Sequence, residues 1–161
     1  MEYYPYLHLM HDPKRPRWWF ILAVILFTII AVVIYQKVWA EEVDLSIIAT
    51  IESGNNHLAY NKGSGACGMY QFTPIAWLDV QRNFPELAKY PFSYAYEPRV
   101  AKLFAKAYFI LIDRYLAHFG LKTSLSNRLA CYNQGIGLTR KGILSKESKN
   151  YIAKYARLEA L

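Results

Sequence analysis

The sequence predicts an all-helical domain with at most a small hairpin, preceded by one N-terminal transmembrane helix. Three observations support this fold class: residues 18–36 form an uninterrupted apolar run, the later apolar positions recur with helical spacing, and alternating strand patterns are nearly absent. The chain has 161 residues, of which 54% are hydrophobic and 16% aromatic. This composition suffices for one buried core and excludes a disordered protein.

The apolar run extends from Trp18 to Gln36 and contains no charged residue. A helix of this length spans about 28 Å, close to the hydrocarbon thickness of a bilayer. Basic residues precede the run, so the positive-inside bias places residues 1–17 in the cytoplasm as a short tail. We therefore expect a transmembrane helix over residues 18–39 and a single-pass membrane protein whose domain, residues 41–161, is periplasmic or otherwise extracytoplasmic.

A cleaved signal peptide is the alternative interpretation of this run. Val38-Trp39-Ala40 offers small residues at the positions that a signal peptidase requires. The apolar run exceeds the length of about 7–15 residues that is usual for a signal peptide, which favours a retained anchor. Both interpretations export the domain.

The first part of the domain contains two helix-start signals. Asp44 is predicted to cap a helix that reaches about Ile51. Residues 53–72 are rich in glycine and asparagine, which predicts a loop or a short hairpin. Thr73 followed by Pro74 is typical of a capped helix start, and this helix is expected to reach about residue 83.

Glu97-Pro98 begins the longest predicted helix, which ends near Phe119 with Gly120 just beyond. Seven positions with helical spacing are its predicted core: Val100, Leu103, Phe104, Ala107, Tyr108, Leu111 and Tyr115. Two further helices are expected over about residues 126–134 and 147–158. The pattern indicates one helical domain without repeats.

The domain is basic, with 15 Lys and Arg against 10 Asp and Glu in residues 41–161. A basic surface favours an anionic partner such as nucleic acid, a lipid surface or bacterial cell wall. The basic residues are scattered and accompany no nucleic-acid-binding motif, so a nucleic-acid partner is not expected. Cys67 and Cys131 are too few for a zinc site. We expect two free buried thiols, with a disulfide as the alternative in an oxidising compartment, and no metal or cofactor.

One acidic residue occupies an unusual position. Glu52 follows an apolar helical run and precedes Ser-Gly-Asn-Asn. The negative end of the helix dipole and apolar neighbours would both raise its carboxyl pKa. A carboxylic acid that stays protonated near neutral pH can donate a proton to a glycosidic oxygen. A solvated residue at a helix end is the alternative, and Glu52 alone does not exclude it.

Three later segments strengthen the case for Glu52. G-A-C-G-M-Y-Q-F-T-P occupies residues 65–74, C-Y-N-Q-G residues 131–135, and E-S-K-N-Y residues 147–151. Together with E-S-G-N-N at residues 52–56, they resemble in order the catalytic domain of soluble lytic transglycosylases. The resemblance covers nearly all of residues 43–158.

The resemblance implies a lysozyme-like helical fold and cleavage of the β-1,4 bond between N-acetylmuramic acid and N-acetylglucosamine in peptidoglycan. In that family one glutamate acts as acid and then as base, and the muramyl C6 hydroxyl closes onto C1 to give a 1,6-anhydro product. A single-glutamate mechanism suits this sequence, because we expect no second catalytic carboxylate beside the motifs. Four other acidic residues are interpreted as helix caps or solvated positions: Asp79, Glu86, Glu97 and Asp113.

The resemblance assigns a role to each motif residue. Glu52 would be catalytic, supported by Ser53, Tyr132, Asn133 and Tyr151. The expected substrate-binding residues are Met69, Tyr70, Gln71 and Phe72. Two positions depart from the family pattern, since Tyr70 stands where the family often has Met and Cys131 where it often has Ala.

Several functional alternatives remain open at this stage. The expected partners are peptidoglycan glycan strands and, through residues 18–36, a lipid bilayer. Cell-wall remodelling, a secretion or conjugation complex, and a virion with an internal membrane all fit a compact wall-degrading enzyme. A lysozyme-type hydrolase, a catalytically inactive peptidoglycan-binding or structural membrane protein, and a purely membrane-active lysis protein are the alternatives.

Overall fold

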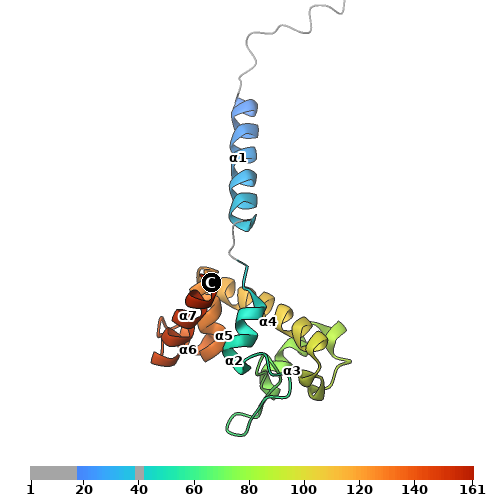
Figure 1. The fold of residues 1–161 in the computed structure, drawn as a ribbon. Helices are drawn as coiled ribbons and strands as arrows, with labels where there is room; N and C mark the ends of the chain where they lie inside the picture. Colours follow the sequence, from blue (N-terminus) through green and yellow to red (C-terminus); the bar gives the residue numbers. More distant parts are fainter. Residues whose placement is uncertain (1–17, 39–41) are drawn as a thin grey trace, which may run out of the picture. The chain divides into compact units, whose positions relative to one another are not determined.

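The structure is a computed structural model. It describes residues 18–38 and 42–161, with side chains along the first helix described for Trp18 and residues 20–31. The chain divides into two compact units, Met1–Ala40 and Glu41–Leu161. The first contains α1, Trp18–Val38, drawn in blue in Figure 1. The predicted tail, residues 1–17, lies outside the described residues. The predicted cleavage site, residues 38–40, lies outside them except for Val38.

A helix is present where the membrane anchor was predicted. Within the described residues, however, no helix combines the length and apolarity that a membrane crossing requires. The membrane-spanning part of the predicted fold class is therefore not supported by the structure.

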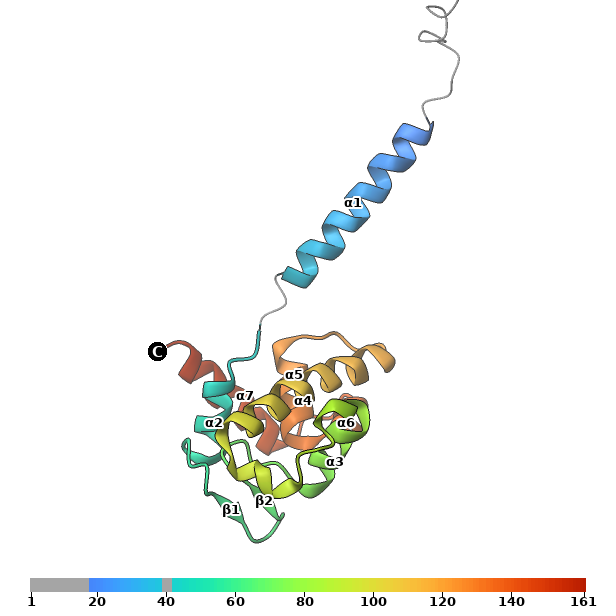
Figure 2. The same cartoon turned by 90° about the vertical axis from the view of Figure 1, so that its right-hand side faces the viewer.

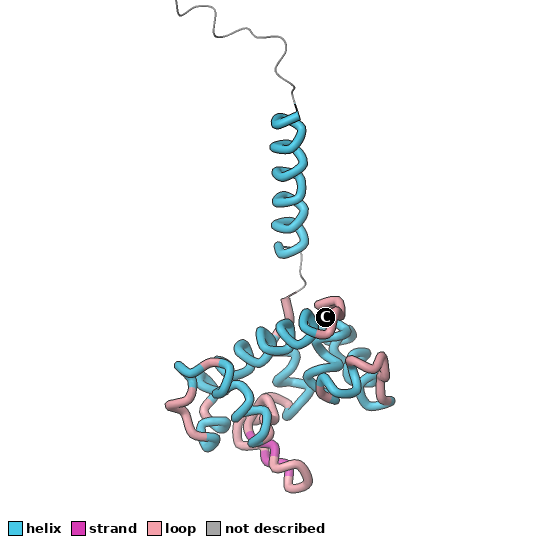
Figure 3. The backbone as a smooth tube through the Cα atoms, turned by 180° about the vertical axis from the view of Figure 1, so that it is seen from behind, coloured by secondary structure: helices cyan, strands magenta, loops and turns pink. Residues whose placement is uncertain are grey.

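The second unit is helical, which confirms the predicted all-α class. Its α-helices are α2 (Leu45–Ser53), α3 (Pro74–Asn83), α4 (Pro98–His118), α5 (Leu125–Gln134), α6 (Ile136–Thr139) and α7 (Lys146–Glu159). Two 3₁₀ helices, η2 (Pro85–Leu87) and η3 (Phe92–Tyr96), lie between α3 and α4. The small hairpin is also present: β1 (Tyr60–Asn61) pairs antiparallel with β2 (Ala66–Cys67), in magenta in Figure 3.

Local capping explains where the helices begin. The Asp44 side chain accepts a hydrogen bond from Ser46 N at the start of α2, and Thr73 Oγ1 accepts one from Ala76 N at the start of α3. Glu97 caps α4 in the same way, by accepting from Arg99 N. Each cap satisfies a backbone N–H that has no partner inside the helix. The three predicted starts are confirmed.

The longest helix, α4, contributes most of the core. Its buried residues are Val100, Ala101, Phe104, Ala105, Ala107, Phe109, Leu111, Ile112 and Leu116. Phe104 stacks on Trp77 of α3 and meets Phe72 edge to face. Leu103, which the spacing assigned to the core, is 48% exposed instead. Leu103 lies at one border of the apolar stripe along α4, whereas the residues at the opposite border are buried.

All buried core residues of the second unit lie between Leu45 and Tyr155. This unit therefore has a complete core of its own and meets the requirement for an independently folding domain. Figure 2 shows its helices packed around α4, with the β1–β2 hairpin at one side. Both cysteines, Cys67 and Cys131, are buried free thiols, as expected.

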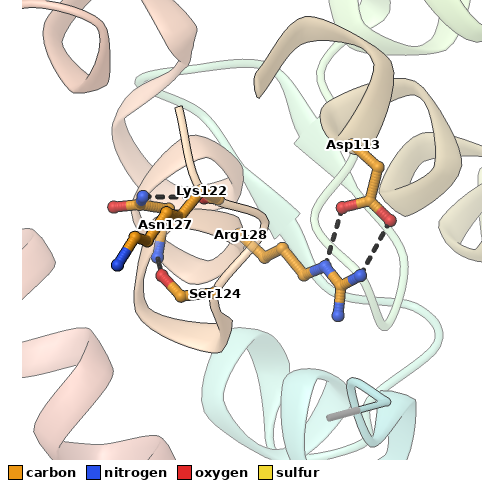
Figure 4. Close-up of polar contacts among 5 residues, drawn as sticks. All are labelled: Asp113, Lys122, Ser124, Asn127 and Arg128. Atoms are coloured by element: carbon orange, nitrogen blue, oxygen red, sulfur yellow. Dashed lines mark hydrogen bonds and ion pairs between the residues drawn. The ribbon is translucent and has the colours of Figure 1, made fainter. Parts of the chain in front are cut away.

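An ion pair joins α4 to α5. Arg128 Nε donates to Asp113 Oδ1 at 2.7 Å, and Arg128 Nη2 donates to Asp113 Oδ2 at 2.9 Å, as drawn in Figure 4. This two-bond geometry fixes both side chains. Ser124 caps α5 nearby, and the Asn127 side chain donates to Lys122 O. Asp113 thus serves as the ion-pair partner of Arg128. Another of the four predicted cap or surface acids, Asp79, accepts a hydrogen bond from Tyr115 Oη at 2.8 Å.

Candidate active site

Glu52 lies in the last turn of α2, where the helix ends abruptly. Gly54 caps the helix in the left-handed conformation, with φ 63° and ψ 34°, and its N–H donates to Thr50 O. Glycine adopts this conformation without the steric cost of a Cβ atom. The Ser-Gly that follows Glu52 therefore stops the helix and fixes where the carboxyl group projects.

The helix that carries Glu52 packs antiparallel against α7. At one end, the Asp44 N–H donates to the Tyr155 hydroxyl at 2.7 Å. At the other end, Lys154 Nζ lies 3.5 Å from Ile51 O, and Tyr151 faces Glu52. Tyr151 and Lys154 are thus brought close to Glu52, although about 100 residues separate them from it in the sequence.

The carboxyl group of Glu52 has a raised pKa. The pKa is raised from 4.5 to about 6, and burial, which removes water from the charged form, is the largest cause. The nearby carboxylate of Glu147 also raises the pKa, whereas the Tyr151 hydroxyl and the Lys154 ammonium lower it. A substantial fraction of Glu52 is therefore protonated in mildly acidic solution, as a proton donor must be.

Tyr151 is the side chain most closely linked to Glu52. Its hydroxyl is buried and meets no partner at strict hydrogen-bond geometry among the described residues. It nevertheless faces Glu52 closely enough to favour the ionised carboxylate. Burial and the Glu52 charge both raise the pKa of Tyr151, so the phenol keeps its proton. The structure thus brings together the first and last of the four motifs.

The glycine-rich loop is tied to the end of α2. Ser53 Oγ lies 2.9 Å from Met69 O and 3.2 Å from Ala49 O, so its hydroxyl bonds to backbone rather than to Glu52. Gln71 has a φ of 49° and donates from Nε2 to Gly68 O at 2.8 Å. The amide nitrogen of Gln71 therefore holds the loop in shape, while Met69 is half-buried next to Ser53.

Tyr132 connects α5 to the same loop. Its hydroxyl donates to Tyr70 O at 2.7 Å, and its ring stacks on Phe109 at a centroid distance of 5.1 Å. Burial raises the pKa of Tyr132, and the charge of Glu52 contributes to that rise. Tyr132 therefore lies within electrostatic range of Glu52, with its hydroxyl hydrogen committed to the loop.

Asn133 connects α5 to the start of α7. Its Oδ1 accepts a hydrogen bond from the buried Ser148 hydroxyl at 2.7 Å. The adjacent Gln134 accepts from Ser145 N and donates to Ile143 O, which fixes the segment between α6 and α7. The two amides hold the helix that carries Tyr151 in register with α5. Sequence reasoning did not single out Gln134, although it lies inside the motif.

Two predicted substrate-binding residues require correction. Tyr70 and Phe72 are each only 3% exposed and belong to the core. Phe72 meets Trp77, Phe104 and Tyr108 edge to face. Because both rings are buried, they offer almost no surface to a sugar. They pack in the core and hold the loop against it. Met69 and Gln71, by contrast, are half-buried and reach the surface.

The structure also reveals residues that the sequence analysis missed. Glu147 and Lys154 both act on the charge of Glu52, from α7. Glu147 was quoted as part of a motif but was not recognised as a second carboxylate near Glu52. Its spacing from Tyr151, four residues on a helix, places both side chains on one face and was the available signal.

Comparison with protein-family models, with curated proteins and with solved structures gives no match. The resemblance to lytic transglycosylases therefore stands on the motif residues described above.

Proposed function

We propose that the chain is a peptidoglycan lytic transglycosylase of lysozyme-like fold that cleaves the bond between N-acetylmuramic acid and N-acetylglucosamine. The observation that carries this proposal is the half-buried Glu52, whose pKa is raised to about 6 beside Tyr151. The ordered motifs supply the choice of substrate, and the surrounding residues support the chemistry step by step.

In the first step, the protonated Glu52 donates its proton to the glycosidic oxygen as the bond to muramyl C1 breaks. In the second, the resulting carboxylate accepts the proton of the muramyl C6 hydroxyl, whose oxygen bonds to C1. The Glu52 proton is thereby restored, and the product carries a 1,6-anhydro ring. Tyr151 supports the intermediate stage, because its hydroxyl favours the ionised carboxylate.

The loop and α5 would supply the substrate surface. Met69 and Gln71 lie on the loop that Ser53 and Tyr132 tie to α2 and α5. We assign these two residues to sugar binding and assign Ser53, Tyr132 and Asn133 to holding the site together. From the sequence alone, the proposal also includes an extracytoplasmic location for the basic domain and a membrane anchor over residues 18–39.

The test is digestion of purified sacculi followed by mass spectrometry of the released muropeptides. The expected products end in 1,6-anhydro-N-acetylmuramic acid, and Glu52→Gln is expected to reduce their release at least about a thousandfold, because general acid and base catalysis are both lost. Glu86→Gln is the matched control, since this exposed residue of η2 undergoes the same chemical change away from the site.

A lysozyme-type hydrolase is the second candidate, favoured by the electrostatic influence of Glu147 on Glu52. Ordinary glycosidases use a pair of carboxylates, one of which activates water or attacks the sugar. Reducing ends in place of anhydro ends would select this candidate. Unchanged release by Glu52→Gln would contradict both enzymes, and no release at all would favour an inactive wall-binding or structural protein.

A further inference from the structure

A second surface, unrelated to Glu52, combines exposed apolar and basic side chains. We define the α6 patch as Phe119, Leu138, Arg140, Lys141, Ile143 and Leu144. Its four apolar members are between 37% and 49% exposed, and both basic members are exposed. Figure 1 shows α6 and α7 at the opposite end of the domain from α3.

The backbone beneath the α6 patch is fixed by hydrogen bonds. Ile143 N donates to Leu138 O at 3.2 Å, and Gly142 N donates to Thr139 O at 3.0 Å. Gln134 Nε2 donates to Ile143 O at 2.7 Å. Because the backbone is held from both sides, the exposure of Leu138, Ile143 and Leu144 reflects a defined surface rather than a frayed loop.

Basic and apolar side chains lie close together in the α6 patch. The Arg140 guanidinium lies 5.2 Å from the centre of the Phe119 ring, which joins the end of α4 to α6. Residues 138–149 contain four basic side chains and one acidic side chain. Lys146 and Lys149, both exposed, extend the positive charge onto the first turns of α7.

We propose that the α6 patch binds the surface of a bilayer that contains anionic lipids. Aliphatic and aromatic side chains flanked by Arg and Lys are the combination that partitions into the headgroup region, where apolar burial and attraction to anionic headgroups add together. Exposed apolar surface of this kind is an interaction site rather than ordinary protein surface. A nucleic acid would contact the basic side chains but would leave Leu138, Ile143 and Leu144 in water.

The proposal depends on neither α1 nor Glu52, so it can be tested on residues 42–161 alone. These residues contain the complete core of the second unit. Sedimentation with phosphatidylcholine vesicles containing phosphatidylglycerol is expected to bring down the domain, whereas pure phosphatidylcholine vesicles do so at least about tenfold less. High salt is expected to weaken binding, because it screens the headgroup attraction.

Two double variants divide the contributions. Arg140→Glu with Lys141→Glu is expected to weaken binding at least about tenfold through charge, and Ile143→Ser with Leu144→Ser by a similar factor through lost apolar burial. The control is Arg82→Glu with Lys106→Glu, which makes the same charge change at exposed positions of α3 and α4. Thermal unfolding verifies that each variant is folded.

Two results would overturn the proposal: no binding to the anionic vesicles, whether or not the domain binds sacculi, or equal loss of binding in the patch and control variants. Release of muropeptides by the same variants reports separately on the proposed enzyme, since none of these substitutions touches Glu52, Tyr151 or the glycine-rich loop.

Discussion

The carboxyl group of Glu52 ionises less readily in the folded chain than in the unfolded one, because burial disfavours its charged form. Between pH 4.5 and about 6 the folded state therefore holds more protons than the unfolded state, and stability falls as the pH rises through this window. A shift of this size corresponds to about 2 kcal/mol. We expect Glu52→Gln to be more stable than the wild type by up to about 2 kcal/mol at pH 8 and equally stable at pH 4.

Urea unfolding of both proteins at the two pH values measures this difference. Glu86→Gln is the control, because its side chain is exposed and should leave the stability unchanged at both. A Glu52→Gln variant that is less stable than the wild type at pH 8 would mean that the ionised carboxylate is held by favourable contacts, and the proton-donor role would lose its physical basis.

The neighbours of Glu52 predict two opposite shifts in the pH dependence of activity. Cleavage should decline as Glu52 loses its proton near pH 6. Tyr151→Phe removes a hydroxyl that favours the carboxylate, so the decline should move to higher pH. Glu147→Gln removes a repelling charge, so it should move to lower pH. Initial rates of sacculus solubilisation at limiting substrate, measured from pH 4 to 9, give both midpoints.

A merely structural role for Tyr151 and Glu147 would lower the rate without moving either midpoint. Glu147 also provides an internal check. Because its side chain is exposed, salt should screen its charge and reduce the shift in the pH midpoint that Glu147→Gln causes. Midpoints that move in the same direction would show that the electrostatic description of the site is wrong.

At the scale of elements, the glycine-rich loop depends on close backbone packing against η3. A Cβ added to Gly68 would lie 1.8 Å from Ala95 O, and Gly68 has a φ of 74°. Gly68→Ala is therefore expected to destabilise the domain by about 3 kcal/mol or more, because the loop must move away from η3. The movement would also displace Met69 and Gln71 and reduce cleavage.

Gly65→Ala is the matched control for this prediction. Gly65 has a similar φ of 69°, but the nearest atom to its added Cβ, Pro74 Cδ, is 4.0 Å away. Only the backbone strain remains, and the expected cost is about 1–2 kcal/mol. Urea unfolding of both variants separates steric overlap from strain. Equal destabilisation of the two variants would show that η3 moves away from the loop at little cost in free energy.

Helix starts were predictable because their signals are local. Asp44, Thr73 and Glu97 each cap the helix that the sequence assigned to them. The start of α5 was placed near Ser126, but Ser124 is the cap, since two serines at this spacing offer equivalent hydroxyl groups. The 3₁₀ helices and α6 escaped prediction because three to five residues are too few to establish a periodicity.

The contacts within the site were less predictable, because they join distant segments. Glu52 was singled out by its position after an apolar run, but its partners Glu147, Tyr151 and Lys154 come from a helix about 100 residues later. Tyr70 was assigned to substrate binding because it lies in the G-A-C-G-M-Y-Q-F-T-P motif, where the resemblance implies that its ring could stack on a sugar. Its ring is buried, and its carbonyl receives the Tyr132 hydroxyl instead. Local sequence cannot show which face of an irregular loop packs.

For the molecule as a whole, the second compact unit, Glu41–Leu161, contains every residue that the two proposals use. The core, the Glu52 site and the α6 patch all lie within residues 42–161. This domain alone is expected to solubilise sacculi in detergent-free buffer with the same 1,6-anhydro products as the full chain. Its rate per mole should stay within about threefold, because every residue of the proposed site lies within residues 42–161. Inactivity of a domain that unfolds cooperatively would assign the lytic effect to the N-terminal segment, whereas activity abolished by Glu52→Gln excludes a purely membrane-active lysis protein.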